Sequence, residues 1–230
     1  MASTAAGQLA RLTHLKLAVS AAYPALASSQ ARLAAMGYVI ADLPAADIDR
    51  LEGLWRELLD HHLAAAPHLA ALGIARDPAD SWRVRRAQYI QWLAVPRAAV
   101  LVARDSDRLL GYAMIRATDA AGSWQWGDQV GTLETLVVAG SERGTGAGRE
   151  LLDAARERMA EWGAQVMTIS VIAGNERAER FYRREGASDY LHTLILPVRQ
   201  PLSLCQCADL GATVEHALQP EHLSPWTGKA

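Results

Sequence analysis

The stretch from Gly131 to Leu152 constrains the fold more than any other part of the sequence. An apolar run, Leu133–Val138, ends at Ala139-Gly140, and a turn with three alternating glycines precedes a helical pattern that starts near Leu151. A strand, a glycine turn and a helix N-terminus leave backbone N–H groups unpaired where the helix dipole favours negative charge. Glycine has no Cβ, so this backbone can approach a ligand closely. The stretch therefore predicts a phosphate-binding site.

Two familiar phosphate-binding turns do not fit this stretch. A P-loop needs a lysine after its last glycine, and the chain has only Lys16 and Lys229. A dinucleotide-binding turn would place its third glycine at Arg149 and an acidic residue at the end of the next strand. That strand ends at Val171-Ile172-Ala173, which holds no carboxylate.

A third form matches, and a second motif accompanies it. The run Arg143–Gly148 has the form Arg/Gln-x-x-Gly-x-Gly/Ala, and Val171–Ala187 has the form V-x-x-x-N-x-x-A-x-x-x-Y-x-x-x-G, with Ala187 where phenylalanine is usual. At this spacing the two runs resemble motifs A and B of the GCN5-related N-acetyltransferase (GNAT) family. The resemblance covers residues 36 to 198. It implies a GNAT fold, in which a mixed central β-sheet is flanked by helices.

The resemblance also implies that acetyl-CoA is the co-substrate and indicates which residues bind it. Backbone N–H groups of the glycine turn would hold the pyrophosphate, the strand before the turn would lie alongside the thiol arm, and Asn175 would cap its helix and contact the same arm. The residues expected to bind the co-substrate are Leu136, Val137, Val138, Arg143, Gly144, Thr145, Gly146, Ala147, Gly148, Arg149 and Asn175.

Two residues are candidates for proton transfer. Tyr182 matches the tyrosine with which the family protonates the CoA thiolate; the alternative is that it only packs against the pantetheine. Glu134 is the first candidate for the base that takes the amine proton, and strand alternation predicts that its side chain faces away from those of Thr135 and Val137. The alternative for Glu134 is a structural carboxylate paired with an arginine. Asp128, in the preceding loop, is the second candidate base.

The pattern of apolar residues predicts a β-α-α-β-β-β-α-β-α-β order, which is an α/β fold with a mixed sheet. Residues 1–35 are predicted to be a helical or flexible extension, 36–198 the acetyltransferase domain and 199–230 a tail. The expected strands are 38–40, 99–104, 109–115, 133–138, 165–172 and 190–198. The expected helices are 47–59, 82–93, 148–162 and 175–184.

Composition excludes several classes of protein. The net charge of −2 provides no basic surplus for nucleic acid. Cys205 and Cys207 have no second Cys/His pair at matching spacing, and His61, His62 and His68 are expected on the surface, so no metal site is predicted. No apolar run is long enough to span a membrane. Residues 17–27 are too interrupted for an export signal, so a cytoplasmic protein is expected.

The function indicated is transfer of an acetyl group from acetyl-CoA to a primary amine of a small molecule or peptide, by direct attack in a ternary complex. The alternative is a non-catalytic module that binds acyl-CoA as a sensor or assembly part. The acceptor is left open, because the helices between 47 and 93, the loop 118–130 and the strand after Gly186 shape its pocket in the family. A homodimer is one alternative for the oligomeric state.

Overall fold

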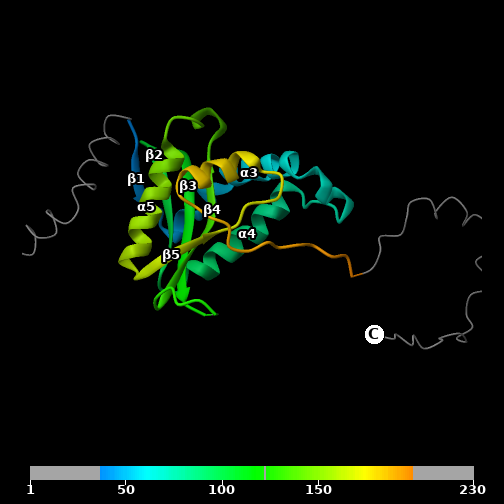
Figure 1. Cartoon of the computed structure of the whole chain (residues 1–230). Helices are drawn as coiled ribbons and strands as arrows, with labels where there is room; N and C mark the ends of the chain where they lie inside the picture. Colours follow the sequence, from blue (N-terminus) through cyan, green and yellow to red (C-terminus); the bar gives the residue numbers. More distant parts are fainter. Residues whose placement is uncertain (1–36, 122, 199–230) are drawn as a thin grey trace, which may run out of the picture. The chain divides into compact units, whose positions relative to one another are not determined.

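A five-stranded sheet with the strand order β1-β2-β3-β4-β5 forms the centre of the structure (Figure 1). The computed structural model describes residues 37–121 and 123–198. Neighbouring strands are antiparallel except β4 and β5, which are parallel, so the predicted mixed α/β sheet is confirmed. The elements are β1 (Val39–Asp42), the 3₁₀ helix η1 (Ala45–Leu51), α3 (Glu52–Ala65), η2 (Pro67–Ala71), α4 (Pro78–Leu93), β2 (Ala98–Asp105), β3 (Arg108–Asp119), β4 (Gln129–Val138), η3 (Gly140–Glu142), α5 (Ala147–Glu161), β5 (Ala164–Ile169) and α6 (Glu176–Arg184).

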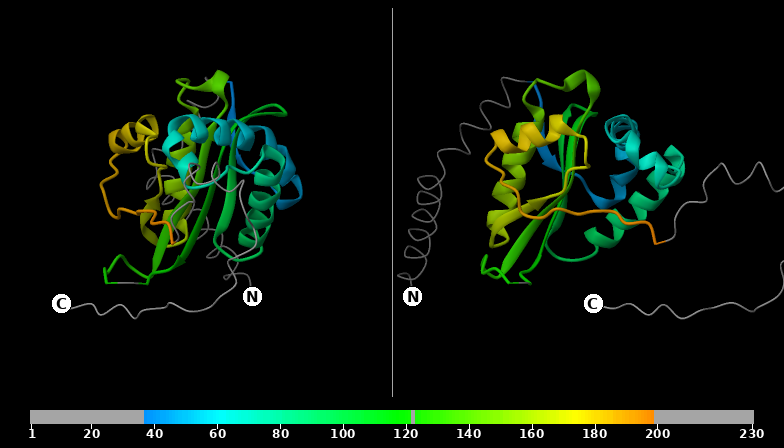
Figure 2. Two further views of the ribbon diagram at one scale, coloured as in Figure 1. Left: turned by 90° about the vertical axis from the view of Figure 1, so that its right-hand side faces the viewer. Right: turned by 45° about the vertical axis from the view of Figure 1, so that its right-hand side comes forward.

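Helices cover both faces of the sheet (Figure 2). Helices α3 and α4 lie on one face, and α5 and α6 lie on the opposite face. The side chains of β3 alternate between the two layers: Tyr112 and Met114 pack towards α3 and α4, whereas Ala113 and Ile115 pack towards α5. The sheet is therefore buried on both sides, which explains the nearly continuous apolar run of β3.

Local signals set the helix bounds. Helix α4 begins earlier than predicted because Asp77 caps it: its carboxylate accepts hydrogen bonds from the amides of Ala79 and Asp80, and Pro78 occupies the first turn. Helix α5 buries an apolar stripe that includes Leu151, Leu152, Ala155 and Met159, which recur at helical spacing. Gly163, with φ +84°, follows the end of α5 in the left-handed conformation that favours glycine.

The predicted strand at 190–198 is wrong. Residues 187–197 form no helix or strand, and β5 is the last strand of the described sheet. Leu194 is 90% exposed and Val198 is 100% exposed. The apolar pattern of this segment favours a strand, but a strand forms only in a ladder with a neighbouring strand, and the pattern alone does not determine whether such a ladder exists.

The structure divides after Ala187, and residues from Ser188 belong to a second unit. The domain bounds of 36–198 therefore stay a prediction. The predicted extension at 1–35, the tail at 199–230, the apolar run at 17–27 and the Cys205/Cys207 pair lie outside the described residues. Within the described ranges no helix has the length and apolarity to cross a membrane, and no three His, Cys, Asp or Glu side chains are grouped to hold a metal ion.

Candidate active site

The strand β4 separates from β5 halfway along its length. Its ladder with β3 runs from Gln129 to Val138, but its parallel ladder with β5 ends at Leu133. Beyond Leu133 none of the residues that the structure describes pairs as a strand with the edge of β4 that faces β5. An open edge of this kind can receive an extended ligand that hydrogen-bonds to the backbone.

The side chains on this part of β4 point to both faces of the sheet. Val137 is buried in the core beneath α3 and α4, whereas Leu136 and Val138 are partly buried against the core beneath α5. Each of the three predicted binding residues therefore has a structural role as well. Their backbone, rather than their side chains, lies at the open edge.

The glycine turn follows the open edge directly and presents free amide groups. Gly144 has φ +91° and Gly146, the N-cap of α5, has φ +102°, so both positions require glycine. None of the described residues accepts a hydrogen bond from the amides of Gly144, Gly146, Ala147 or Gly148. Four donors at the N-terminus of a 15-residue helix form a site suited to an anion.

The polar side chains of the turn differ in their contacts. The hydroxyl of Thr145 donates to the carbonyl of Glu142 at 2.8 Å, and its amide donates to the same carbonyl at 3.3 Å, so Thr145 stabilises the turn and leaves neither donor free for a ligand. Arg149 forms an ion pair with Glu185 at 3.2 Å, yet its side chain is 60% exposed. Arg143 is exposed and has no ion pair with any residue in the described ranges. Arg143 therefore has its full charge available to a phosphate.

Tyr182 extends from α6 into the core beneath α5, next to Phe181 at 5.1 Å between ring centroids. Burial raises the pKa of Tyr182 to about 12. The hydroxyl therefore keeps its proton at neutral pH, and no described residue hydrogen-bonds to it. A protonated hydroxyl of this kind is able to donate to a leaving group, and the acid role of Tyr182 stays a prediction.

Glu134 does not face the side that strand alternation predicts. The register between β3 and β4 shifts at this residue, because Met114 pairs with Thr135 and Ile115 with Leu133. Glu134 is thus the extra residue of a β-bulge. Its Oε1 accepts a hydrogen bond from Nε of Arg116 at 2.5 Å, on the α4 face that Thr135 also reaches. The prediction that Glu134 faces away from Thr135 is wrong.

The carboxylate of Glu134 is held firmly in this position. Its side chain is 16% exposed, and the guanidinium of Arg116 lies 4.9 Å from the ring of Trp92 on α4. The second carboxylate oxygen, Oε2, has no hydrogen-bond partner among the described residues. The ion pair supports the structural role proposed as the alternative, and Oε2 remains able to accept a proton directly or through water.

A hydrogen-bonded cluster lies beside Glu134 in the core beneath α4. The hydroxyl of Tyr89 lies 2.6 Å from Oγ1 of Thr135 and 3.2 Å from the hydroxyl of Tyr112. Burial is the main cause that raises the pKa of both tyrosines. These neutral hydroxyls fix α4 against the bulge of β4.

The N-cap of α6 is tied to α3. Oδ1 of Asn175 accepts a hydrogen bond from the amide of Ala178 at 3.2 Å, which confirms the predicted cap, and lies 3.3 Å from Nε2 of His61. A Cβ on Gly174 would lie 2.3 Å from the carbonyl oxygen of Ala65, so only glycine allows α3 to approach this loop. His61 and its neighbour His62 thus belong to α3 and reach the site, rather than lying only on a free surface.

Sequence reasoning missed three residues of this site, namely His61, Arg85 and Arg116. The spacing of residues in the sequence contains a signal for Arg85 and Arg116. Arg85 shares the spacing of Trp82, Tyr89 and Trp92, which places it on the apolar face of α4. Arg116 follows Tyr112 and Met114 at two-residue intervals, which places it on the α4 face of β3.

The tryptophans of the β3–β4 loop do not belong to the core. Trp124 is 66% exposed, and neither it nor Trp126 belongs to either core cluster. Asp128 is exposed at the opposite end of β4 from the glycine turn. Glu134 lies six positions further along the chain, roughly 20 Å at about 3.3 Å per residue, so the two candidate bases do not share one site.

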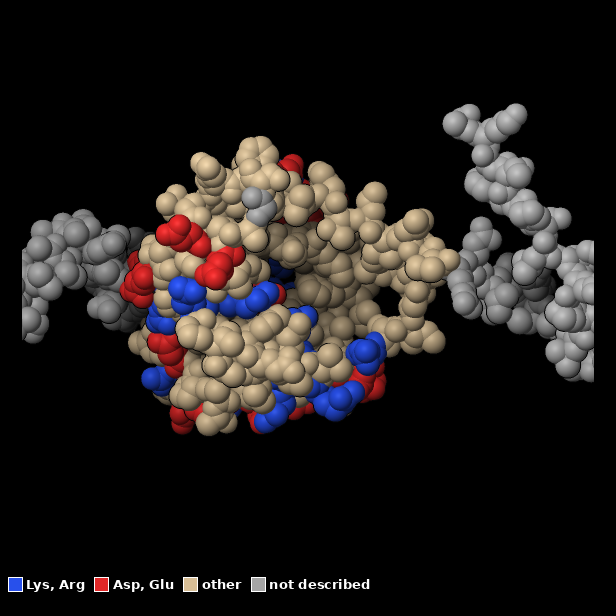
Figure 3. Space-filling view, turned by 90° about the horizontal axis from the view of Figure 1, so that it is seen from below, with Lys and Arg blue, Asp and Glu red and all other residues tan. Residues whose placement is uncertain are grey.

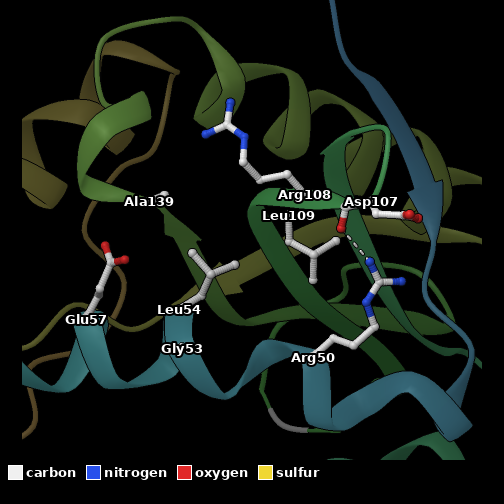
Figure 4. Close-up of a pocket in the computed structure, with 8 residues that line it drawn as sticks. All are labelled: Arg50, Gly53, Leu54, Glu57, Asp107, Arg108, Leu109 and Ala139. Atoms are coloured by element: carbon white, nitrogen blue, oxygen red, sulfur yellow. Dashed lines mark hydrogen bonds between the residues drawn. The ribbon is translucent and has the colours of Figure 1, made fainter.

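A cavity of about 390 Å³ lies at the glycine-turn end of β4, between α3 and the β2–β3 turn (Figure 4). Its polar groups are largely engaged: Arg50 donates to the carbonyl of Asp107 at 2.6 Å, Arg108 pairs with Glu142 at 2.7 Å, and Glu57 accepts from the amide of Gly140 at 2.8 Å. The cavity contains neither predicted catalytic residue. It is lined by Arg50, Gly53, Leu54, Glu57, Asp107, Arg108, Leu109 and Ala139.

The fold resembles that of several solved structures, two of which are named as N-acetyltransferases. A mutant of a Bacillus halodurans protein matches with a TM-score of 0.58 at 19% identity, and a GCN5-related N-acetyltransferase from Ralstonia eutropha with a TM-score of 0.56 at 18%; each match covers 70% of this chain and 99% of the other. An aminoglycoside N-acetyltransferase in complex with CoA matches with a TM-score of 0.54 at 15% identity, over 70% of this chain and 95% of that one. These similarities define the fold class.

Sequence comparison identifies the family. The profile of the acetyltransferase (GNAT) family matches residues 55–187, which is more than half of the chain, so the protein belongs to this family. Uncharacterized N-acetyltransferases of Mycobacterium tuberculosis and Mycobacterium bovis are each 34% identical to it over 100 residues. That match covers 44% of this chain and 59% of each relative's length.

Proposed function

We propose that this protein transfers an acetyl group from acetyl-CoA to a primary amine of a small molecule or peptide, by direct attack of the amine in a ternary complex. The observation that carries the proposal is the open edge of β4 beyond Leu133, which ends at four amide donors that find no acceptor in the described ranges. An extended pantetheine arm fits such an edge, and a pyrophosphate fits such donors. Membership of the GNAT family supports the same co-substrate.

In the proposed reaction a C–N bond forms at the thioester carbonyl while the C–S bond breaks and its electron pair passes to sulfur. A backbone N–H of residues 136–138 would polarise the carbonyl, and such a donor typically contributes about 10²–10³ in rate. Tyr182 would give its proton to the sulfur, because its hydroxyl is protonated and forms no hydrogen bond with the part of the chain that the structure describes. Oε2 of Glu134 would take the amine proton, directly or through water.

The second candidate is the non-catalytic acyl-CoA-binding module. The ion pair between Arg116 and Glu134 favours it, because a carboxylate held by an arginine can serve the fold alone. In that case acetyl-CoA binds to β4 and the glycine turn, but no amine accepts the acetyl group.

Release of free thiol from acetyl-CoA distinguishes the transferase from the non-catalytic binding module. The purified chain is assayed with a panel of amino acids, polyamines, an aminoglycoside and peptide N-termini, while calorimetry measures acetyl-CoA binding. Amine-dependent thiol release supports the transferase. Tight binding with no release from any amine would support the binding module.

We also propose that the protein acts in the cytoplasm, without a nucleic-acid partner, as a homodimer. The net charge of −2 supports the absence of nucleic acid, as do the interspersed acidic and basic side chains in Figure 3. The exposed apolar side chains of Leu191, Leu194 and Val198 support association. Cell fractionation and light scattering of the purified chain check the location and the oligomeric state.

A further inference from the structure

Arg85 of α4 places a positive charge over an aromatic surface that α3 and α4 form together. The carbon at the centre of its guanidinium lies 4.6 Å from the ring of Trp55, 5.7 Å from that of Tyr89 and 6.0 Å from that of Trp92. The side chain is half-buried. Stacking on aromatic rings fixes the plane of the guanidinium and leaves its N–H groups directed outward from the edge of that plane.

This charge has no counter-ion in the described ranges 37–121 and 123–198. The other two arginines of α4 each have one: Arg83 pairs with Asp80, and Arg86 pairs with Asp49. Arg85 forms no ion pair or hydrogen bond with any of these residues. A half-buried guanidinium without an anion is costly, because its donors are partly removed from water and are not satisfied by protein.

Arg85 lies in the candidate active site. Its aromatic neighbour Trp92 also contacts Arg116, which holds Glu134. On the other side its charge acts on His62, whose pKa is lowered first by burial and then by the charges of His61 and Arg85. The α4 face of β4 beside Glu134 is therefore lined by positive or neutral groups, with Glu134 already paired.

We propose that Arg85 binds a carboxylate of the acceptor, so that the acceptor is an amine that also carries a carboxylate, such as an amino acid. This inference rests on the proposed transferase function. A guanidinium donates two parallel hydrogen bonds to a carboxylate, which adds orientation to charge attraction. A polyamine brings only further positive charge next to Arg85 and Arg116, and it is a poorer acceptor for that reason.

Matched amines that differ only in the carboxylate test the proposal: tyrosine and tyramine, lysine and cadaverine, tryptophan and tryptamine. The carboxylated member of an accepted pair should show a kcat/KM about 10- to 100-fold higher, the range that a charge-assisted hydrogen bond provides. Arg85→Gln should reduce that ratio towards one, chiefly through KM, and Arg85→Lys should retain part of it. Arg83→Gln removes the same charge from the exposed side of α4 and should leave the ratio unchanged.

Calorimetry with the CoA-bound protein repeats the comparison without turnover. Carboxylated members should bind more tightly than their amines, and Arg85→Gln should remove the difference. Absence of any turnover, with this binding difference intact, would refute the transferase but retain Arg85 as a carboxylate site. Two results would overturn the assignment of Arg85 as a carboxylate site. One is equal kcat/KM and equal binding for both members of every pair, and the other is an equal loss of kcat/KM for both members in a folded Arg85→Lys variant.

Discussion

Replacing Arg116 by glutamine should destabilise the fold by about 2 kcal/mol. The pair that it forms with Glu134 is mostly buried, with side chains 32% and 16% exposed. Breaking a fully buried pair costs about 3–5 kcal/mol, and a fully exposed pair contributes about 0–1 kcal/mol, so this pair lies between the two limits. Loss of the contact with Trp92 adds about 0.5–1 kcal/mol. Urea unfolding of the two proteins measures the difference directly.

The matched control is Arg97→Gln, because Arg97 pairs with Asp119 at 3.3 Å with side chains 42% and 86% exposed. That substitution should change the free energy of unfolding by less than about 0.5 kcal/mol. In a double-mutant cycle, Arg116 and Glu134 should show a coupling energy of about 1–2 kcal/mol. Equal, small effects of Arg116→Gln and Arg97→Gln, with no coupling to Glu134, would refute the reasoning.

Three further substitutions test, in turn, proton transfer by Tyr182, binding of acetyl-CoA at the glycine turn and packing of α4 against β4. Tyr182→Phe should lower kcat by about 10²–10⁴ with little change in acetyl-CoA affinity, and an unchanged kcat would remove Tyr182 from the acid role. Because a pKa of about 12 keeps the Tyr182 hydroxyl protonated, the wild-type rate should not fall up to pH 10. Gly144→Ala should cost about 1–2 kcal/mol of stability from its φ of +91°, since nothing lies within 4 Å of the new Cβ, and should raise the acetyl-CoA Kd seen by calorimetry. Tyr89→Phe should cost about 1–3 kcal/mol in urea unfolding, because it leaves the hydroxyl of Thr135 without its 2.6 Å partner; no loss would contradict the hydrogen bond.

The local features of the fold were predictable because short-range rules determine them. The glycine turn requires positive φ at Gly144 and Gly146, and the spacing of apolar residues in α5 follows from one buried face. The N-cap of α6 at Asn175 was predictable for the same reason. Each of these depends on a few consecutive residues, so the sequence contains all the information that the prediction needs.

The contacts that define the site depend on residues far apart in the chain. His61 and Asn175 are separated by 114 positions, and no local sequence pattern predicts that their side chains are in contact. The segment 190–198 illustrates the opposite error: its apolar pattern favours a strand, but a strand forms only with a partner. Predictions were therefore reliable for elements that local rules determine, and much less so where a distant partner decides the outcome.

The orientation of Glu134 shows how one irregularity controls the site. Alternation assumes a constant register, and the bulge at Glu134 breaks that register by one residue, which brings its carboxylate to Arg116 on the α4 face. The ladder between β4 and β5 ends at Leu133, the residue just before the bulge. The bulge thus coincides with the opening of the β4 edge, and it turns the carboxylate of Glu134 towards α4, the helix that contains Arg85. In the proposed enzyme, the edge for the co-substrate and the face for the acceptor therefore begin at one position of β4.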